Sequence, residues 1–222
     1  MRPKHIAIIP DGNRRWARRH KISKVEAYEK GIDKIANVLK WCKKYGIRTL
    51  TMWGFSTENF RREKEEVRQL FLLFDKKLTE GLKKDYKKYK ARVRFLGNLQ
   101  AFPLQLQEKM KKAEAETAKN TKYTLNLLIG YGGRQEILNA VNLAIEEGKK
   151  LDMKGFERLL YLQDEPDLVI RTSGEIRTSG FLPWQTAYSE YYFCKKLWPD
   201  FSEADFKRAL EEYSRRKRKY GR

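Results

Sequence analysis

The sequence predicts an α/β fold in which a central, mostly parallel sheet of six strands is flanked by helices. Short apolar runs alternate along the chain with long amphipathic segments, a pattern typical of a strand layer covered by helices. The chain has 222 residues, 41% of them hydrophobic, which is enough for one sizeable core. No repeat or linker-like stretch divides the sequence, so we expect a single domain over residues 1–222.

Six short apolar runs are the expected strands. The first, HIAII, is an almost uninterrupted apolar run that reads as a buried strand. The others share this character and are separated by amphipathic segments. In chain order they are His5–Ile9, Thr49–Trp53, Arg92–Leu96, Tyr123–Leu128, Asp167–Arg171 and a shorter one near Tyr191–Cys194.

The helices are predicted from apolar residues that recur every three or four positions. In segment 63–90 this spacing joins a stripe made of Val67, Leu70, Phe71, Phe74, Leu78 and Leu82. In chain order the expected helices are Asn13–His20, Lys24–Tyr45, Glu63–Lys90, Leu104–Lys119, Arg134–Glu147, Phe156–Leu162 and Glu203–Arg218.

Composition narrows the function classes. The formal net charge of +20 favours polyanionic partners: nucleic acid, anionic membranes or phosphorylated substrates. Two distant cysteines, Cys42 and Cys194, disfavour a disulfide framework, and two histidines are too few for a multi-histidine metal site. No apolar run has the length of a membrane span and the first residues lack a signal-peptide pattern. We therefore expect a cytoplasmic protein with peripheral contact to membranes.

Residues after the first strand suit a diphosphate, because ligands of open parallel sheets bind at the carboxyl ends of strands. In DGNRRWARR, Gly12 permits a tight turn, and the start of the next helix offers N–H groups to an anion beside several arginines. Asp11 would repel such an anion unless a cation such as Mg²⁺ lay between them. The alternative is that Asp11 merely caps a solvated basic helix.

The loops after the second and fourth strands are less informative. Taken alone, GFSTENFRR reads as the start of a helix that Ser56 or Thr57 caps. GYGGR matches neither the P-loop nor the full dinucleotide-binding pattern, so we interpret its glycines as sites of close backbone packing.

The loop after the fifth strand, RTSGEIRTSG, suits a second diphosphate. It carries Arg171 and Arg177 with hydroxyl groups between them, and arginine gives fork-shaped bonds to phosphate; a solvated loop is the alternative. Downstream, Glu190 lies in the apolar stretch AYSEYYF, where a carboxylate is capped, paired or bound to metal. Two anion sites, a carboxylate and an apolar helix together fit a substrate with a diphosphate head and a hydrocarbon tail.

These motifs, in this order, resemble those of the cis-prenyltransferase family, the undecaprenyl diphosphate synthase-like enzymes. The similarity covers nearly the whole chain, through HIAIIPDGNRRWA, FSTENF, LNLLIGYGGR, DLVIRTSGEIRTSGFLPWQTAYSEYYF and LWPDF, and the DGNRR form favours the archaeal type. The resemblance implies a homodimer with an undecaprenyl diphosphate synthase-like fold. It also implies a Mg²⁺-dependent condensation of an allylic diphosphate with isopentenyl diphosphate to a cis-polyprenyl diphosphate.

The resemblance further implies roles for single residues. Asp11 and Asn59 are the expected catalytic residues, and Asp11 would engage Mg²⁺ with support from Glu190. The residues expected to bind the allylic diphosphate are Gly12, Asn13, Arg14, Arg15, Trp16 and Lys24. Those expected to bind the isopentenyl diphosphate are Ser56, Phe60, Arg62, Arg171, Arg177 and Ser179. The apolar stripe of segment 63–90 would line a tunnel for the growing chain.

Several positions depart from the family pattern, two of them at expected histidines. Tyr28 and Ile176 stand where many bacterial members carry histidines, which changes the expected surroundings of the metal and the phosphates. An alternative function is therefore prenyl transfer to an unusual acceptor, either a second allylic diphosphate joined non-head-to-tail or an alcohol. Analysis of the reaction products distinguishes this alternative from condensation with isopentenyl diphosphate.

Two further alternatives have less support. The charge and the basic residues 215–219 permit a nucleic-acid-binding protein, but no nucleic-acid-binding motif is present, so we expect no nucleic-acid partner. A non-catalytic subunit of a heteromeric prenyltransferase usually lacks the acid and the first diphosphate loop. Here Asp11, Asn59 and Arg171 are all present, which argues against that alternative.

Overall fold

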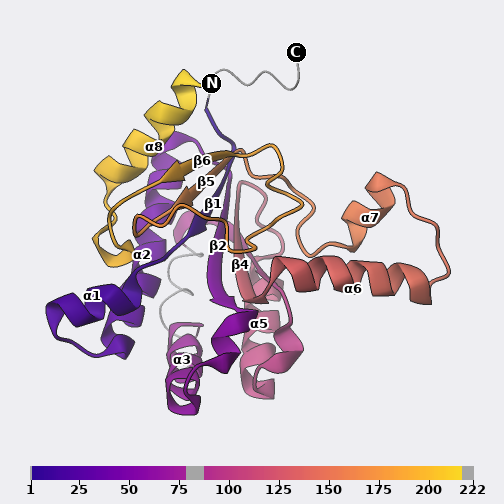
Figure 1. Cartoon of the computed structure of the whole chain (residues 1–222), viewed down its shortest axis with the longest axis horizontal. Coiled ribbons are helices and arrows are strands. Elements are labelled where there is room, and N and C mark those ends of the chain that lie inside the picture. Colours follow the sequence, from indigo (N-terminus) through magenta and orange to yellow (C-terminus); the bar gives the residue numbers. More distant parts are fainter. Residues whose placement is uncertain (1, 79–87, 217–222) are drawn as a thin grey trace.

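The computed structural model, which describes residues 2–78 and 88–216, has the predicted fold class. Six strands form one sheet in the order β3-β4-β2-β1-β5-β6, and every neighbouring pair is parallel (Figure 1). The strands are β1 (His5–Ile9), β2 (Thr49–Ser56), β3 (Ala91–Leu96), β4 (Tyr123–Tyr131), β5 (Leu168–Arg171) and β6 (Glu190–Phe193). Both β2 and β4 extend further at their carboxyl ends than predicted.

Helices connect the strands, and the first two have the predicted bounds. At the start of α2, Ser23 and Glu26 form a capping box, and α2 ends at Gly46 in a left-handed conformation. None of the helices within the described ranges is long and apolar enough to cross a membrane. The helices are α1 (Asn13–His20), α2 (Lys24–Tyr45), α3 (Lys64–Lys76), α5 (Leu104–Thr117), α6 (Gly133–Glu146), α7 (Met153–Leu159) and α8 (Glu203–Arg215), with short 3₁₀ turns η1 (Thr57–Arg61), η3 (Leu99–Ala101) and η4 (Trp198–Asp200).

Two of the predicted helices differ clearly from the structure, whereas α5 and α6 differ from it by one or two residues at their ends. The helix predicted over Phe156–Leu162 begins earlier, at Met153, because the Asp152 carboxylate accepts a hydrogen bond from the Gly155 amide at 2.7 Å and caps that start. The helix predicted over Glu63–Lys90 is α3 as far as Lys76, and its part at 79–87, including Leu82, lies outside the described residues. The predicted end of the last helix at Arg218 also lies outside them.

Strand side chains alternate between two apolar layers, one on each face of the sheet. In β1, Ile6 and Ile8 pack in the layer that α2, α3, α5 and α8 cover, whereas Ala7 and Ile9 pack in the other. Residues before and after β5 cover this second layer, to which they contribute Leu162, Phe181 and Leu182. Helices α6 and α7 project from the body of the molecule (Figure 1). Since β1 is buried on both faces, it forms the centre of the sheet.

The glycines of GYGGR serve close packing, as the sequence predicts. The Gly133 amide donates a hydrogen bond to the Gly180 carbonyl at 3.1 Å. A side chain at Gly133 would collide with that carbonyl oxygen and with the ring of Pro183. The glycine therefore lets α6 begin directly against the loop that follows β5.

A buried histidine lies at the amino end of β1. The His5 Nε2 atom is 2.8 Å from Thr51 Oγ1, which also accepts a hydrogen bond from the Asn126 amide at 3.0 Å. Burial lowers the pKa of His5 from 6.5 to about 4, although Asp164 and Asp167 favour its protonation. His5 is therefore neutral in the folded chain at neutral pH.

We expect the free energy of unfolding to fall as the pH drops from about 6.5 to about 4. In this window the unfolded chain binds a proton that folded His5 does not. The contribution of neutral His5 to the free energy of unfolding is therefore complete above pH 6.5 and is lost as the pH falls toward 4. The shift corresponds to about 3 kcal/mol. Urea denaturation of the wild type and His5→Gln at several pH values tests this. Stability curves that stay parallel through the window would contradict it.

Candidate active site

The parallel register brings the carboxyl ends of β1, β2 and β5 to one edge of the sheet. Ile9 pairs with Arg171 across β1 and β5, and Ile8 pairs with Met52 across β1 and β2. The loops that follow these strands consequently meet at this edge, as the sequence predicts.

Asp11, in the loop after β1, contacts residues of α1 and of the end of β5. Its Oδ2 atom accepts a hydrogen bond from the Arg171 guanidinium at 2.9 Å, and Oδ1 lies 3.5 Å from a nitrogen of Arg15. Its carbonyl accepts hydrogen bonds from the Thr172 hydroxyl at 2.8 Å and the Trp198 amide at 3.0 Å. The Asp11 carboxylate does not cap α1, so that alternative interpretation is wrong.

Gly12 is the N-cap of α1, and a residue with a side chain would not fit at this position. Its φ is +111°, a conformation that residues with a side chain rarely adopt. An added Cβ atom would lie 2.8 Å from Leu197 Cδ2. No side chain caps α1 and its first turn carries no acid, so the amides at its start and the dipole favour an anion.

A basic cavity of about 640 Å³ opens beside the start of α1. It holds five of the six residues that the sequence assigns to the allylic diphosphate, and Arg18 and Arg62 also line it. Trp16 does not: its indole N–H donates to Asp200 at 2.7 Å and its ring stacks on His20. The five residues are Gly12, Asn13, Arg14, Arg15 and Lys24.

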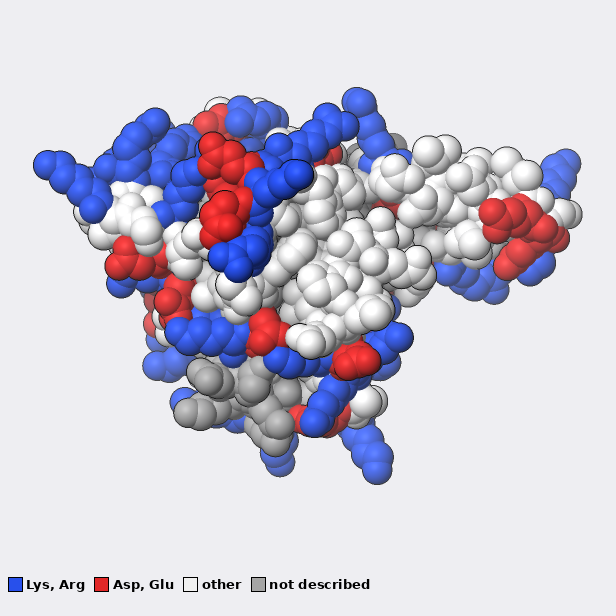
Figure 2. All heavy atoms as spheres, turned by 90° about the horizontal axis from the view of Figure 1, so that it is seen from below, with Lys and Arg blue, Asp and Glu red and all other residues white. Residues whose placement is uncertain are grey.

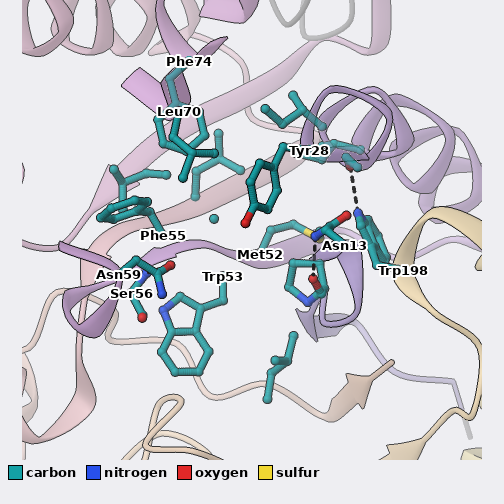
Figure 3. Close-up of a pocket in the computed structure, with 18 of the residues that line it drawn as sticks. Asn13, Tyr28, Met52, Trp53, Phe55, Ser56, Asn59, Leu70, Phe74 and Trp198 are labelled. Carbon is teal, nitrogen blue, oxygen red and sulfur yellow. Dashed lines mark hydrogen bonds between the residues drawn. The ribbon is translucent and has the colours of Figure 1, made fainter. Parts of the chain in front are cut away.

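An apolar cavity of about 480 Å³ lies next to it, between the sheet and helices α2, α3 and α5 (Figure 3). Leu70, Phe74 and Leu78 of the predicted stripe line this cavity. Val67 and Phe71 pack against the core instead. Figure 3 shows Ser56 and Asn59 across the cavity from Tyr28, and the Asn59 side-chain carbonyl accepts a hydrogen bond from the Ser56 amide at 3.1 Å.

The two cavities meet. Both are lined by Pro10, Asp11, Asn13, Tyr28 and Arg62. A ligand can therefore place a charged group in the basic cavity and an apolar group in the other, with the Asp11 carboxylate at the boundary.

A hydrogen-bonded cluster forms one wall of this junction. Glu66 accepts hydrogen bonds from Lys24 at 2.7 Å, from the Tyr28 hydroxyl at 2.9 Å and from Arg62 at 3.2 Å. Arg62 also donates to the Tyr28 hydroxyl at 3.0 Å. Burial opposes ionisation of Glu66, but these donors lower its pKa, while burial raises the pKa of Tyr28. The cluster holds Lys24 and Arg62 at the edge of the basic cavity.

The end of β5 and the loop after it contribute Arg171 and Ser179 to the apolar cavity. The buried Arg171 guanidinium donates to the Ser179 hydroxyl at 2.8 Å and to the Arg177 carbonyl at 2.5 Å. Ser173 and Ser179 have φ of +84° and +54°, so the loop stores backbone strain of the kind that gathers at functional sites. The Arg177 side chain is exposed and pairs with Glu175.

Phe60, predicted to contact the isopentenyl diphosphate, does not line either cavity. Its ring packs against Phe55 and Phe102, with centroids 4.9 and 5.3 Å apart. The aromatic character of this residue is thus explained by the core below the cavity.

The structure does not bring Glu190 to Asp11 within one chain. Glu190 begins β6 in register with Leu168, whereas Arg171, at the far end of β5, is the residue beside Asp11. Three residues of strand separate the two levels, about 10 Å. Glu190 instead accepts a hydrogen bond from Arg216 at 2.7 Å. In residues 2–78 and 88–216, no group of three or more His, Cys, Asp or Glu residues could hold a metal ion.

Sequence reasoning missed two carboxylates at this site, Glu66 and Glu175. Glu66 belongs to the charged run REKEEV, which looks like a solvated helix start, and only the packing of α3 on α2 buries it. Glu175 stands between Arg171 and Arg177 in the quoted loop motif, and its place among arginines was the available signal.

Comparison with known proteins identifies the relatives of this chain. The family model for undecaprenyl diphosphate synthases matches residues 9–221. The chain is 43% identical to an isoprenyl transferase of Thermotoga maritima over 99% of this chain and 97% of that one. It is 47% identical to a tritrans,polycis-undecaprenyl-diphosphate synthase (geranylgeranyl-diphosphate specific) of Thermoplasma acidophilum, over 100% of this chain and 90% of the relative.

Among solved structures, the chain is similar to the lavandulyl diphosphate synthase of Lavandula x intermedia, crystallised in complex with dimethylallyl diphosphate. The TM-score is 0.93 at 33% identity, and the similarity covers 99% of this chain and 98% of the other.

We expect Gly12→Ala to lower the free energy of unfolding by about 2–3 kcal/mol, because the new methyl group combines a strained φ with overlap on Leu197. Gly46→Ala is the matched control: its φ is also positive, at +76°, but its surroundings are open, so about 1 kcal/mol is expected. Chemical denaturation measures both. Equal losses would show that the contact with Leu197 does not matter.

Proposed function

This chain belongs to the undecaprenyl diphosphate synthase family of prenyltransferases, and on that premise we propose that it condenses an allylic diphosphate with isopentenyl diphosphate to build a cis-polyprenyl diphosphate. The observation that carries the proposal is the junction at Asp11 between a basic and an apolar cavity. A prenyl diphosphate has one part suited to each.

The allylic substrate occupies both cavities in this proposal. Its diphosphate lies at the start of α1 with Arg14 and Arg15, and its hydrocarbon tail extends past Tyr28 toward Leu70 and Phe74. As the carbon–oxygen bond breaks, negative charge grows on the leaving diphosphate. Prearranged arginines and helix amides stabilise that charge without reorganising, which is the main way such sites lower a barrier.

Isopentenyl diphosphate binds across from it, with its diphosphate on Arg171, Arg177 and Ser179. Support comes from the position of Arg171 and Ser179 at the apolar cavity and from the strained loop that holds them. Ser56 and Asn59 position the acceptor. Its double bond forms the new carbon–carbon bond to the allylic carbon, diphosphate departs with the electron pair, and the acceptor loses a proton.

The residues at the junction fit Mg²⁺ shared with a substrate. Mg²⁺ is commonly held by one or two carboxylates plus substrate phosphates, not by an all-protein cage. Asp11, with a partly exposed carboxylate beside the basic cavity, is the residue that would hold it. When bound, the ion would supply positive charge for the departing diphosphate. Glu190 is left out of this set because of its place in β6.

The primer we propose is geranylgeranyl diphosphate. The Thermoplasma acidophilum relative is named as specific for it, and similar proteins of Methanocaldococcus jannaschii and Pyrococcus horikoshii carry the same name. The apolar cavity, lined by side chains from α2, α3, α5 and the sheet, supports a long hydrocarbon.

A second candidate is condensation of two allylic diphosphates, or transfer to an alcohol. The similarity to a lavandulyl diphosphate synthase that binds dimethylallyl diphosphate supports this second candidate function. Tyr28 and Ile176, where many bacterial members have histidines, are the residues of this chain that would distinguish such an acceptor site.

The test is a turnover assay with labelled isopentenyl diphosphate, Mg²⁺ and allylic primers of increasing length. We expect products that rise in five-carbon steps, fastest with geranylgeranyl diphosphate, and no product with EDTA. Asp11→Asn should lower kcat roughly 10²–10³-fold, because it removes a preorganised charge at the reacting centre. Asp164→Asn, an exposed aspartate near His5, is the control and should keep full activity.

The outcomes separate the candidates. Products formed from allylic diphosphates or an added alcohol, and none from isopentenyl diphosphate, would replace the first proposal by the second. Full activity of Asp11→Asn would remove Asp11 from the catalytic residues.

We also propose that the protein works as a homodimer with peripheral contact to anionic membranes. The net charge of +20 supports the membrane contact. The dimer is supported by exposed apolar side chains on the projecting arm formed by α6 and α7, where Leu138, Ile145 and Met153 are 51–70% exposed. Figure 2 shows an uncharged middle on this arm, bordered by charged residues at its tip.

We expect Leu138→Glu to shift the dimer toward monomer, because a charge buried in an apolar interface is costly. Light scattering after size-exclusion chromatography measures the mass. Leu104→Glu, on α5 and 76% exposed against 51% for Leu138, is the control and should leave the dimer intact. A wild-type protein that is monomeric at micromolar concentration would contradict the dimer, and an unaffected Leu138→Glu dimer would place the interface elsewhere.

A further inference from the structure

One carboxylate, that of Glu175, connects the two proposed diphosphate sites. Its Oε1 atom accepts a hydrogen bond from Arg15 of α1 at 2.9 Å, and its Oε2 atom accepts one from Arg177. Arg15 lines the basic cavity, whereas Arg177 belongs to the loop of the proposed isopentenyl diphosphate site. The two arginines come from different elements, α1 and the loop after β5, and share this one partner.

Glu175 completes a ring of charged groups. Asp11 joins Arg15 to Arg171, Arg171 donates to the Arg177 carbonyl, and Glu175 joins Arg177 back to Arg15. The ring therefore holds three cations and two carboxylates, and the backbone carbonyl of Arg177 links Arg171 to Arg177. The arginines assigned to the two diphosphates are thus partly neutralised by carboxylates.

We propose that Glu175 is a positioning residue that couples the two sites, so that each diphosphate binds more tightly when the other is present. The inference rests on the proposed function, because it assigns Arg15 and Arg177 to different diphosphates. It concerns the acid between the arginines, which the resemblance to the family leaves without a role.

The sign of the coupling follows from competition. A diphosphate at Arg15 places several negative charges beside Glu175, and like charges at this distance repel. The Glu175 side chain is 28% exposed, so it can turn toward water when displaced. Once displaced, it no longer neutralises Arg177. Binding of the first ligand thus supplies the free energy that displaces Glu175. The second ligand binds without that cost.

The experiment is isothermal titration calorimetry of isopentenyl diphosphate in the presence of Mg²⁺. Each protein is titrated with and without a saturating allylic thiodiphosphate, whose carbon–sulfur bond resists cleavage, so no turnover occurs. The proteins are the wild type, Glu175→Gln and Glu65→Gln. Glu65 is the matched control because it also pairs with an arginine, Arg68 at 2.9 Å, on the surface of α3.

In the wild type and in Glu65→Gln, we expect the analogue to lower the Kd of isopentenyl diphosphate by about fivefold or more. In Glu175→Gln, the Kd without analogue should already be lower than in the wild type, because the competing charge is gone. The analogue should then change it by less than about twofold. Reversing the order of titration must give the same coupling factor.

Two results would overturn the inference. One is wild-type coupling retained in Glu175→Gln. The other is weaker binding of isopentenyl diphosphate alone to Glu175→Gln, which would mean that Glu175 orders the arginines and does not compete with substrate. A wild-type protein that binds neither diphosphate would instead refute the proposed function, so the two failures are distinguishable.

Discussion

The ion pair between Asp11 and Arg171 is the interaction on which the site depends. It joins the ends of two neighbouring central strands, β1 and β5, and it gives a carboxylate partner to a guanidinium that is almost fully buried. An unpaired charge at such depth would be strongly destabilising. Because Arg171 also binds the Arg177 carbonyl and Ser179, the same guanidinium determines the path of the loop that carries the second anion site.

The two faces of the sheet differ in what covers them around this ion pair. One face is covered by amphipathic helices, and the apolar cavity lies within that layer, between α2, α3 and α5. The other is closed by Leu162, which precedes β5, and by Phe181 and Leu182, which follow the loop that carries Arg177. The helical side is therefore suited to receive a hydrocarbon, and the loop side holds charge in place.

Apolar periodicity predicts most of the fold, since α1 and α2 have the predicted bounds and all six strands lie where they are expected. The family predicted from the motifs is confirmed by comparison with known proteins. What periodicity could not predict depends on tertiary contacts. Glu66 reaches the site only because α3 packs on α2. The position of Glu190 depends on the register of β6 against β5. The start of α7 was missed because Asp152, and not the apolar pattern, determines it.

The contact between Gly12 and Leu197 has a consequence for how this site could have arisen or be transplanted. The turn that begins α1 is shaped by a residue from near the other end of the chain, and Trp198 next to it holds the Asp11 carbonyl. The short motif DGNRR is thus not a self-contained cassette. Moved into another parallel sheet, it would bring the charges without the surface that gives them their geometry, so inheritance of this chemistry requires inheritance of the whole domain.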